Sequence, residues 1–221
     1  MKETYLYHAI CISEGEKLFY DQKKSMKILE EILKDEHLYS RRMQGIVDEK
    51  TINFSGLDYI SFCDRKLRFA KPYQNTPFLK HYTVYDNYIS SSLSLGFDRK
   101  GIDVISTELV EPIAISCMPE VTIEKYGLSS DLKYSDMADE VQVKDKVSLG
   151  NLKCLTLPVH LMINRYANII YDCGDICRCV EDINILMSDY NYSVPIYDLH
   201  SKEKLNSEEQ VQKVMKKYRM R

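Results

Sequence analysis

Tryptophan is absent from this 221-residue sequence, glycine occurs only 8 times, and neither sign of charge is in large excess. The net charge of −3 arises from 30 basic and 33 acidic side chains. Proteins that bind nucleic-acid duplexes usually carry a strong basic excess, because much of their affinity comes from neutralising phosphates. The overall charge therefore argues against a duplex-binding protein. A net charge of this size still allows a local basic patch on the surface.

Long apolar runs are also missing. No stretch approaches the roughly 18 to 20 apolar residues that cross a bilayer, which predicts that no membrane partner is involved. The start of the sequence lacks the pattern of a signal peptide. Seven cysteines cannot all pair with one another, so we expect reduced thiols and a cytoplasmic location.

Several enzyme motifs are missing as well. The sequence contains no phosphate-binding loop ending in Lys-Ser/Thr, no GxGxxG, no HExxH and no GxSxG. The order of its expected elements also lacks the regular alternation of a doubly wound parallel sheet. A Rossmann or P-loop nucleotide enzyme is therefore disfavoured.

What is present is typical of one globular domain over residues 1–221. Hydrophobic residues make up 44% of the sequence and charged residues 29%, which is enough to bury a sizeable core. Alternation and aromatic or β-branched content predict strands at 5–12, 57–63, 91–97, 101–105, 111–118, 140–144, 152–157 and 192–199. Helical periodicity and capping signals predict helices at 25–37, 129–138, after Pro158, at 175–187 and after Ser207.

These elements favour an α+β fold. We expect a split, mostly antiparallel sheet with flanking helices, a core at about 5–157 and a C-terminal helical extension at about 158–221. Pro195 lies inside the last expected strand. It predicts that this strand lies at an edge of the sheet, because proline has no N–H to donate to a neighbouring strand.

Three features of the expected strands carry chemistry. His8 lies within the first strand, Tyr59 and Ser61 share one face of the second, and Glu140 opens a strand near the middle of the chain. Each has a plain structural interpretation: a satisfied strand histidine, two packing residues and a solvated charge at the start of a strand.

Taken together, the segments YLYHAI and DEVQVKDKVSLGNLKCLTLP resemble the ADP-ribosyltransferase superfamily over about residues 5–157. The resemblance implies a sheet of ADP-ribosyltransferase type and NAD as substrate. It implies that Glu140 is catalytic and stabilises the oxocarbenium-like state, and that His8 holds the NAD ribose. Tyr59, or with less support Tyr7, would stack on the nicotinamide, and Ser61 would support that pocket by hydrogen bonding.

A set of basic residues surrounds the second expected strand: Arg41, Arg42, Arg65, Lys66 and Arg68. Such a set is either a solvated surface or a clamp for the NAD pyrophosphate or a nucleic-acid target. We assign Arg41 from this set to cofactor binding. The resemblance further implies a macromolecular acceptor and a toxin-like role.

The sequence also departs from the family pattern. Ile10 replaces the hydroxyl residue that usually follows the family's histidine, and Ala138 stands where members that modify arginine carry Gln or Glu. An arginine acceptor is therefore disfavoured. Two alternatives stay open: a non-enzymatic module that binds a nucleotide or protein in a similar cleft, and an RNA phosphotransferase-like enzyme.

The cysteines suggest little chemistry of their own. Cys173, Cys177 and Cys179 form a single cluster, whereas zinc sites usually combine two closely spaced pairs, so no metal is expected. A cysteine nucleophile paired with His8 or His160 lacks a local signature. The candidates for it are Cys11, Cys63 and Cys117.

Overall fold

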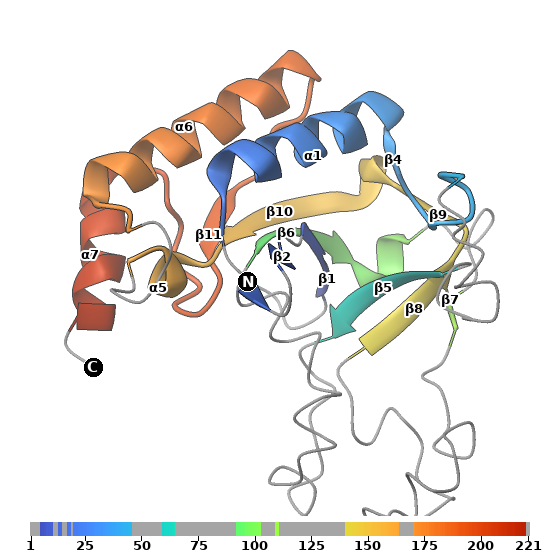
Figure 1. Cartoon of the computed structure of the whole chain (residues 1–221), viewed down its shortest axis with the longest axis horizontal. Coiled ribbons are helices and arrows are strands. Elements are labelled where there is room, and N and C mark those ends of the chain that lie inside the picture. The colour runs from blue at the N-terminus through green and yellow to red at the C-terminus, as the bar shows by residue number, and fades with distance from the viewer. Residues whose placement is uncertain are drawn as a thin grey trace, which may run out of the picture.

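The computed structural model describes residues 5–10, 13–14, 17–18, 20–45, 59–64, 92–102, 109–110, 140–163 and 170–219. In Figure 1, helices α1 and α6 lie side by side across one face of a twisted sheet. The expected α+β class, with a mostly antiparallel sheet and flanking helices, is confirmed at this level.

The main sheet has seven strands in the order β11-β10-β6-β1-β5-β8-β7. Their bounds are β1 Tyr5–Ile10, β5 Tyr59–Asp64, β6 Leu93–Asp98, β7 Leu109–Val110, β8 Glu140–Lys144, β10 Leu152–Leu157 and β11 Ile196–Asp198. Neighbours are antiparallel except for β10 and β11, which run parallel. Two small ladders pair β2 (Ser13–Glu14) with β3 (Lys17–Leu18), and β4 (His37–Tyr39) with β9 (Lys146–Ser148).

The described helices are α1 (Gln22–Asp35), α5 (Val159–Met162), α6 (Cys173–Asp189) and α7 (Glu208–Arg219), with 3-10 turns at Arg99–Gly101 and Leu149–Asn151. Side chains fix their first turns. The carboxylate of Asp21 accepts from the backbone N–H of Lys24 at 2.9 Å, and Asp172 and Asp175 form a reciprocal capping box at α6. Ser207 caps α7 through the N–H of Gln210 at 3.3 Å, as its sequence signal predicts.

The core lies between the helices and the sheet. Leu29 and Leu33 of α1 pack with Ile176 and Ile183 of α6 against inward residues of the strands. The fully buried strand residues of this cluster are Leu6, Phe62, Leu93, Leu95, Phe97, Val143, Val147, Leu155 and Leu157. Each such side chain contributes about 1.5–3 kcal/mol by leaving water, so this layer supplies much of the driving force for folding.

The opposite face of the sheet has its own small cluster, formed by Tyr7, Ala9, Cys154 and Leu199. Gly96 makes the close packing possible. A Cβ atom added there would lie 2.5 Å from the Sγ of Cys154 and 3.1 Å from the Cε1 of Tyr7. The middle strands are therefore packed on both faces.

The region after residue 157 is more than a helical extension. Strand β11 joins the main sheet beside β10, and α6 packs into the central core. The prediction of an edge strand near Pro195 is confirmed, since β11 ends the sheet and the carbonyl of Pro195 accepts from the N–H of Leu155 at 3.0 Å.

Other expectations differ from the structure. The helix expected at 25–37 is α1, Gln22–Asp35, and the residues that follow it form β4. The strand expected at 101–105 does not begin at Gly101, which ends a 3-10 turn at Arg99–Gly101 where the side chain of Asp98 accepts from the N–H of Lys100 at 3.0 Å. Residues 103–105 lie outside the described residues. The expected strand at 111–118 and helix at 129–138 lie outside the described residues.

Candidate functional site

The three strands that carry the predicted site residues are neighbours in the middle of the sheet. Strand β5 pairs with β1 on one side and with β8 on the other (Figure 1). The register joins Tyr7 to Cys63 and Cys63 to Glu140. Strands β1 and β8, which are far apart in the sequence, thus lie on either side of β5.

His8 lies where the pairing of β1 with β5 ends. The ladder joins Leu6 to Asp64 and Tyr7 to Cys63, and then the Nδ1 of His8 lies 3.0 Å from the carbonyl oxygen of Ser61. A carbonyl can only accept, so Nδ1 carries the proton and donates. The imidazole therefore replaces a backbone ladder bond and holds the two strands together at their point of separation.

The surroundings of His8 keep the imidazole neutral. The half-buried ring lies with its centroid 5.7 Å from that of Phe62. Burial lowers the pKa of His8, and the hydrogen bond to the Ser61 carbonyl opposes this only in part. With Nδ1 donating, the Nε2 atom of the neutral ring is a hydrogen-bond acceptor.

His8 and Glu140 do not belong to the same row of the sheet. His8 pairs with Leu95 and lies on the same face of β1 as Leu6 and Ile10, which pack in the core beneath the helices. The backbone of Glu140 is aligned, through Cys63, with Tyr7. Successive rows of a sheet face opposite sides, so the side chains of His8 and Glu140 belong to opposite faces. The contact that His8 makes with β5 is its hydrogen bond to the backbone carbonyl of Ser61.

Tyr59 and Arg41 lie toward the other end of β5. Tyr59 pairs with Lys144, four residues along β5 from Cys63, the partner of Glu140. Four strand residues span ~13 Å. The N–H of Ser40 bonds the carbonyl of Asp145 at 2.7 Å, so the turn that carries exposed Arg41 lies beyond this end.

Ser61 occupies an intermediate position. It lies midway between Tyr59 and Cys63 on β5 and pairs with Gln142 of β8. It is half-buried. The predicted residues are therefore spread along β5 and its neighbours rather than gathered at one point. The remaining basic candidates Arg65, Lys66 and Arg68, like Ala138, lie outside the described residues.

Sequence reasoning missed a polar cluster at the end of β11. Asp198 is fully buried, and its Oδ2 accepts from the N–H of Ser201 at 2.6 Å and from the hydroxyl of Tyr218. Its Oδ1 is buried without a hydrogen-bond partner among the described residues. Nearby, the rings of His160 and His200 lie 4.1 Å apart in a T-shaped contact.

The cluster brings together side chains from β11, α5 and α7. Burial, and to a lesser degree His200, lowers the pKa of His160 to about 4. Burial and the hydrogen bond to Asp198 raise the pKa of Tyr218. Asp198 on β11 is thereby tied to α7, while His160 comes from α5. No linear motif connects these residues, so only their burial in the fold reveals them.

The predicted cysteine cluster lies on α6. Burial raises the pKa of Cys179 to about 12 and that of Cys173 to about 11, so both thiols are protonated near neutral pH. Cys173, Cys177 and Cys179 are free. In the described part of the chain, no group of three histidine, cysteine or acidic residues is arranged to hold a metal ion.

Comparison of the chain with protein-family models, with curated proteins and with solved structures finds no match. Among the helices in the described ranges, none is long and apolar enough to cross a membrane.

Proposed function

We propose that this chain is an NAD-dependent ADP-ribosyltransferase that modifies a macromolecular acceptor, with Glu140 as its catalytic residue. The observation that supports the proposal is the adjacency of β1, β5 and β8 in the sheet. The strands that carry His8, Ser61 and Glu140 are neighbours in space, and their register aligns the backbone of Glu140 with that of Tyr7 on the first strand.

The chemistry requires little beyond positioning and charge. The bond between nicotinamide and C1 of its ribose breaks, nicotinamide leaves with the bonding electrons, and C1 develops positive charge. A carboxylate fixed near C1 stabilises that charge. A nucleophilic atom of the acceptor then bonds to C1 and loses its proton, and the same carboxylate is suited to accept it.

In this proposal, NAD runs along β5. The nicotinamide ribose lies near Glu140, Ser61 supports the nicotinamide pocket, and Tyr59 stacks on the nicotinamide. The pyrophosphate is attached to the same ribose, so Arg41, beyond the Tyr59 end, clamps it only when NAD is folded back over its nicotinamide. Tyr7 is only 3% exposed and packs against Cys154 and Leu199, which favours Tyr59 over Tyr7 as the stacking residue.

The proposed role of His8 depends on the point where β1 and β5 separate. Its Nδ1 is engaged by the Ser61 carbonyl, so Nε2 is the atom that can accept from a ribose hydroxyl. His8 belongs to the row that faces the helices, on the opposite side of the sheet from the row of Glu140, so one ribose does not contact both side chains. In this proposal His8 holds an NAD ribose where β1 and β5 separate, and Glu140 lies against C1 of the nicotinamide ribose.

The test is transfer of label from NAD labelled in its adenylate half to proteins of a cell lysate. We expect labelling by the native chain and at least a 100-fold loss with Glu140→Gln, which keeps the size of the side chain but removes its charge. Glu31→Gln, at an exposed position of α1, is the matched control and should label normally. Equal labelling by the native chain and Glu140→Gln removes Glu140 from the mechanism.

Purified protein separates the alternatives. Nicotinamide release from NAD alone supports glycosidic cleavage by the chain itself. Tight NAD binding without turnover contradicts the enzymatic proposal and favours a binding module. Activity restricted to phosphorylated RNA ends contradicts it in favour of a phosphotransferase.

A further inference from the structure

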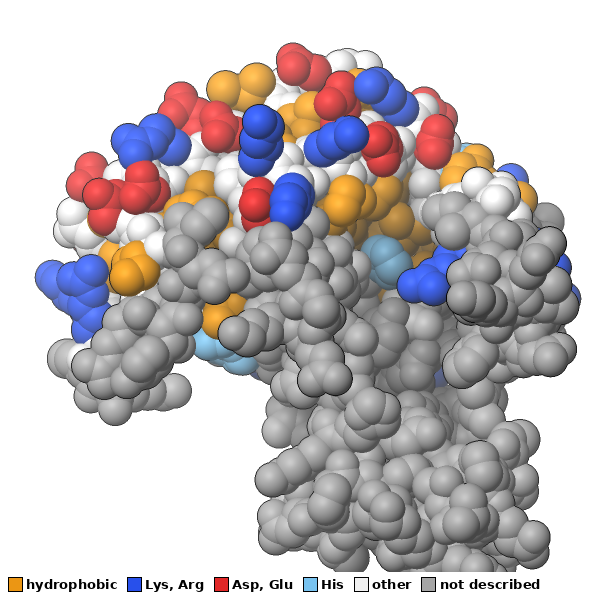
Figure 2. Space-filling model, viewed as in Figure 1, with side chains coloured by type: hydrophobic (Ala, Val, Ile, Leu, Met, Phe, Trp, Pro, Cys, Tyr) orange, Lys and Arg blue, Asp and Glu red, His pale blue; other side chains and the backbone are white. Residues whose placement is uncertain are grey.

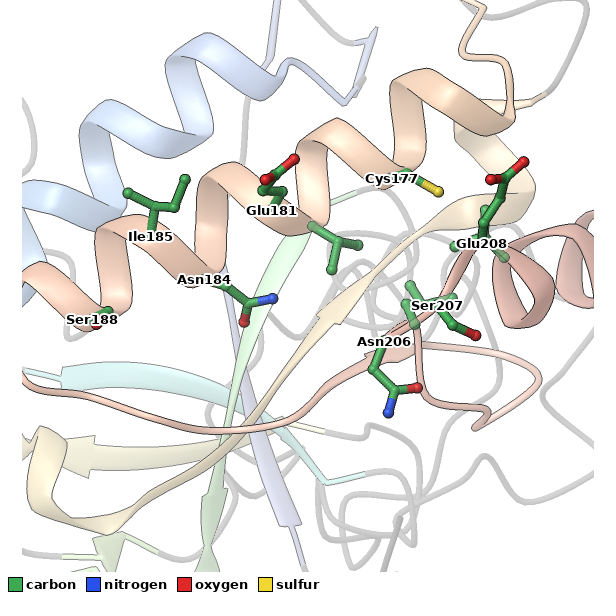
Figure 3. Close-up of a pocket in the computed structure, with 11 residues that line it drawn as sticks. Cys177, Glu181, Asn184, Ile185, Ser188, Asn206, Ser207 and Glu208 are labelled. Atoms are coloured by element: carbon green, nitrogen blue, oxygen red, sulfur yellow. The ribbon is translucent and has the colours of Figure 1, made fainter.

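A groove of about 410 Å³ lies between the flank of α6 and the segment from Leu205 into the first turns of α7 (Figure 3). Val180, Ile185, Leu205 and Val211 supply apolar lining. The groove runs beside the face of α6 that packs in the core, since Val180 belongs both to its lining and to the central cluster.

The apolar lining is exposed to solvent at its end on α6. Ile185 is 55% exposed, whereas most of its apolar neighbours on this helix are buried. An exposed isoleucine beside a concave surface gains free energy when an apolar group covers it. The groove is therefore suited to receive an apolar side chain.

The rim of the groove is acidic. Glu181 on α6 and Glu208 at the start of α7 line it, and among the described residues that line it there is no lysine or arginine. The Oε1 of Glu208 is held by the amide of Gln212 at 3.0 Å. The α6 side has the same sign, since this helix carries Asp175, Glu181, Asp182 and Asp189 against Arg178. The basic residues of α7 begin at Lys213, beyond Glu208 and Val211, which line the groove. Figure 2 shows acidic side chains gathered over the end of α6 near α7.

We propose that this groove docks a short peptide segment of a partner protein, in which an apolar side chain is flanked by lysine or arginine. The apolar side chain covers Ile185 and the lining beside it, and the cation lies between Glu181 and Glu208. The amides of Asn184 and Asn206, on the two walls, offer donors and acceptors to the backbone of the peptide (Figure 3).

A second copy of this chain fits the groove less well. Its basic segment is the end of α7, with Lys216, Lys217 and Arg219. The apolar residues of that helix, Val214 and Met215, are buried in its own core and cannot enter a neighbour's groove while α7 is folded. Anionic ligands are repelled by the two glutamates.

The binding test uses three fluorescent nine-residue peptides. The first has two leucines flanked by lysines, the second has glutamates in place of the lysines, and the third has serines in place of the leucines. We expect the first to bind at least ten-fold more tightly than either of the others in fluorescence anisotropy, and more weakly as salt rises. The first peptide should also slow the alkylation of Cys177, which lines the groove. Mass spectrometry of the proteolytic fragment that contains Cys177 follows this reaction.

Variants locate the binding. Glu181→Lys and Ile185→Ser change exposed side chains, so the fold is expected to persist, and each should weaken the first peptide at least five-fold. Glu31→Lys on α1 is the matched charge reversal outside the groove and should leave the affinity unchanged. Equal affinity for all three peptides overturns the proposal. So does an equal loss with Glu31→Lys, or a dimer that dissociates with Glu181→Lys.

Discussion

The imidazole of His8 donates a hydrogen bond of 3.0 Å to the backbone carbonyl of Ser61, at the point where β1 and β5 stop pairing. A side chain thus supplies the bond that the ladder no longer provides. Removing it leaves a carbonyl without its partner in a packed part of the sheet, where an unmade bond costs about 1–3 kcal/mol.

We therefore predict that His8→Phe lowers the free energy of unfolding by about 1–3 kcal/mol, although it keeps an aromatic ring against Phe62. Urea denaturation followed by circular dichroism measures the change. His37→Phe is the matched control, because the Nδ1 of His37 also bonds a carbonyl at 3.0 Å, that of Asp35, but in a solvent-exposed place. A loss for His37→Phe as large as that for His8→Phe contradicts the prediction.

The burial of His160, with a smaller contribution from His200, makes stability depend on pH. The pKa of His160 is lowered to about 4 in the folded chain, below the value near 6.5 of an unfolded chain. Between these values the unfolded chain binds more protons, so stability is complete above the unfolded pKa and decreases as the pH falls.

We predict that the free energy of unfolding of the native chain falls by about 1 kcal/mol more than that of His160→Phe between pH 7 and pH 5, after allowance for solvent screening. Denaturant titrations at the two pH values measure the difference. His200→Phe removes a like charge and should shift the NMR titration of His160 upward. Parallel pH profiles for the native chain and His160→Phe would show that His160 does not carry the effect.

Elements with strong local signals were predictable from the sequence. Strands 140–144 and 152–157 were confirmed at the predicted bounds of β8 and β10, and Ser207 caps α7 as predicted. Short ladders such as β4 with β9 were missed, because three residues carry no periodicity and their pairing depends on distant partners.

The arrangement of the candidate site was less accessible. Sequence places His8 and Glu140 on strands, but the register that aligns Glu140 with Tyr7 depends on how three distant segments pair. A shift by one residue exchanges the faces of a strand, and nothing local fixes it. The cluster of Asp198 and Tyr218 was missed for a similar reason. The sequence does not show that Asp198 is buried or that the fold brings Tyr218 into hydrogen-bonding contact with it.

The hydroxyl of Tyr218 ties the last helix to the buried carboxylate of Asp198. We predict that Tyr218→Phe lowers the free energy of unfolding by about 1–3 kcal/mol, because a buried carboxylate loses a charge-assisted bond. Tyr190→Phe is the matched control, since its hydroxyl bonds the exposed carboxylate of Glu30 at only 3.4 Å and should matter by less than about 0.5 kcal/mol. Thermal unfolding of both variants tests this, and equal losses would contradict it.

The contact of Gly96 with Cys154 gives the sharpest test of packing on the sheet face opposite the helices. A methyl group at residue 96 would lie 2.5 Å from the Sγ of Cys154, so Gly96→Ala should destabilise the chain by about 1–3 kcal/mol through overpacking. Cys154→Ala removes that sulfur, which is fully buried. In the double variant Gly96→Ala/Cys154→Ala, the added methyl occupies part of the vacated space.

The double-mutant cycle should therefore be non-additive, with the double variant more stable than the sum of the two single losses by about 1 kcal/mol or more. Free energies of unfolding for the four proteins measure the coupling. The Cε1 atom of Tyr7, 3.1 Å from the same position, has to shift by only a few tenths of an ångström and so should limit the rescue without abolishing it. Strict additivity would mean that the sulfur of Cys154 is not what the added methyl meets.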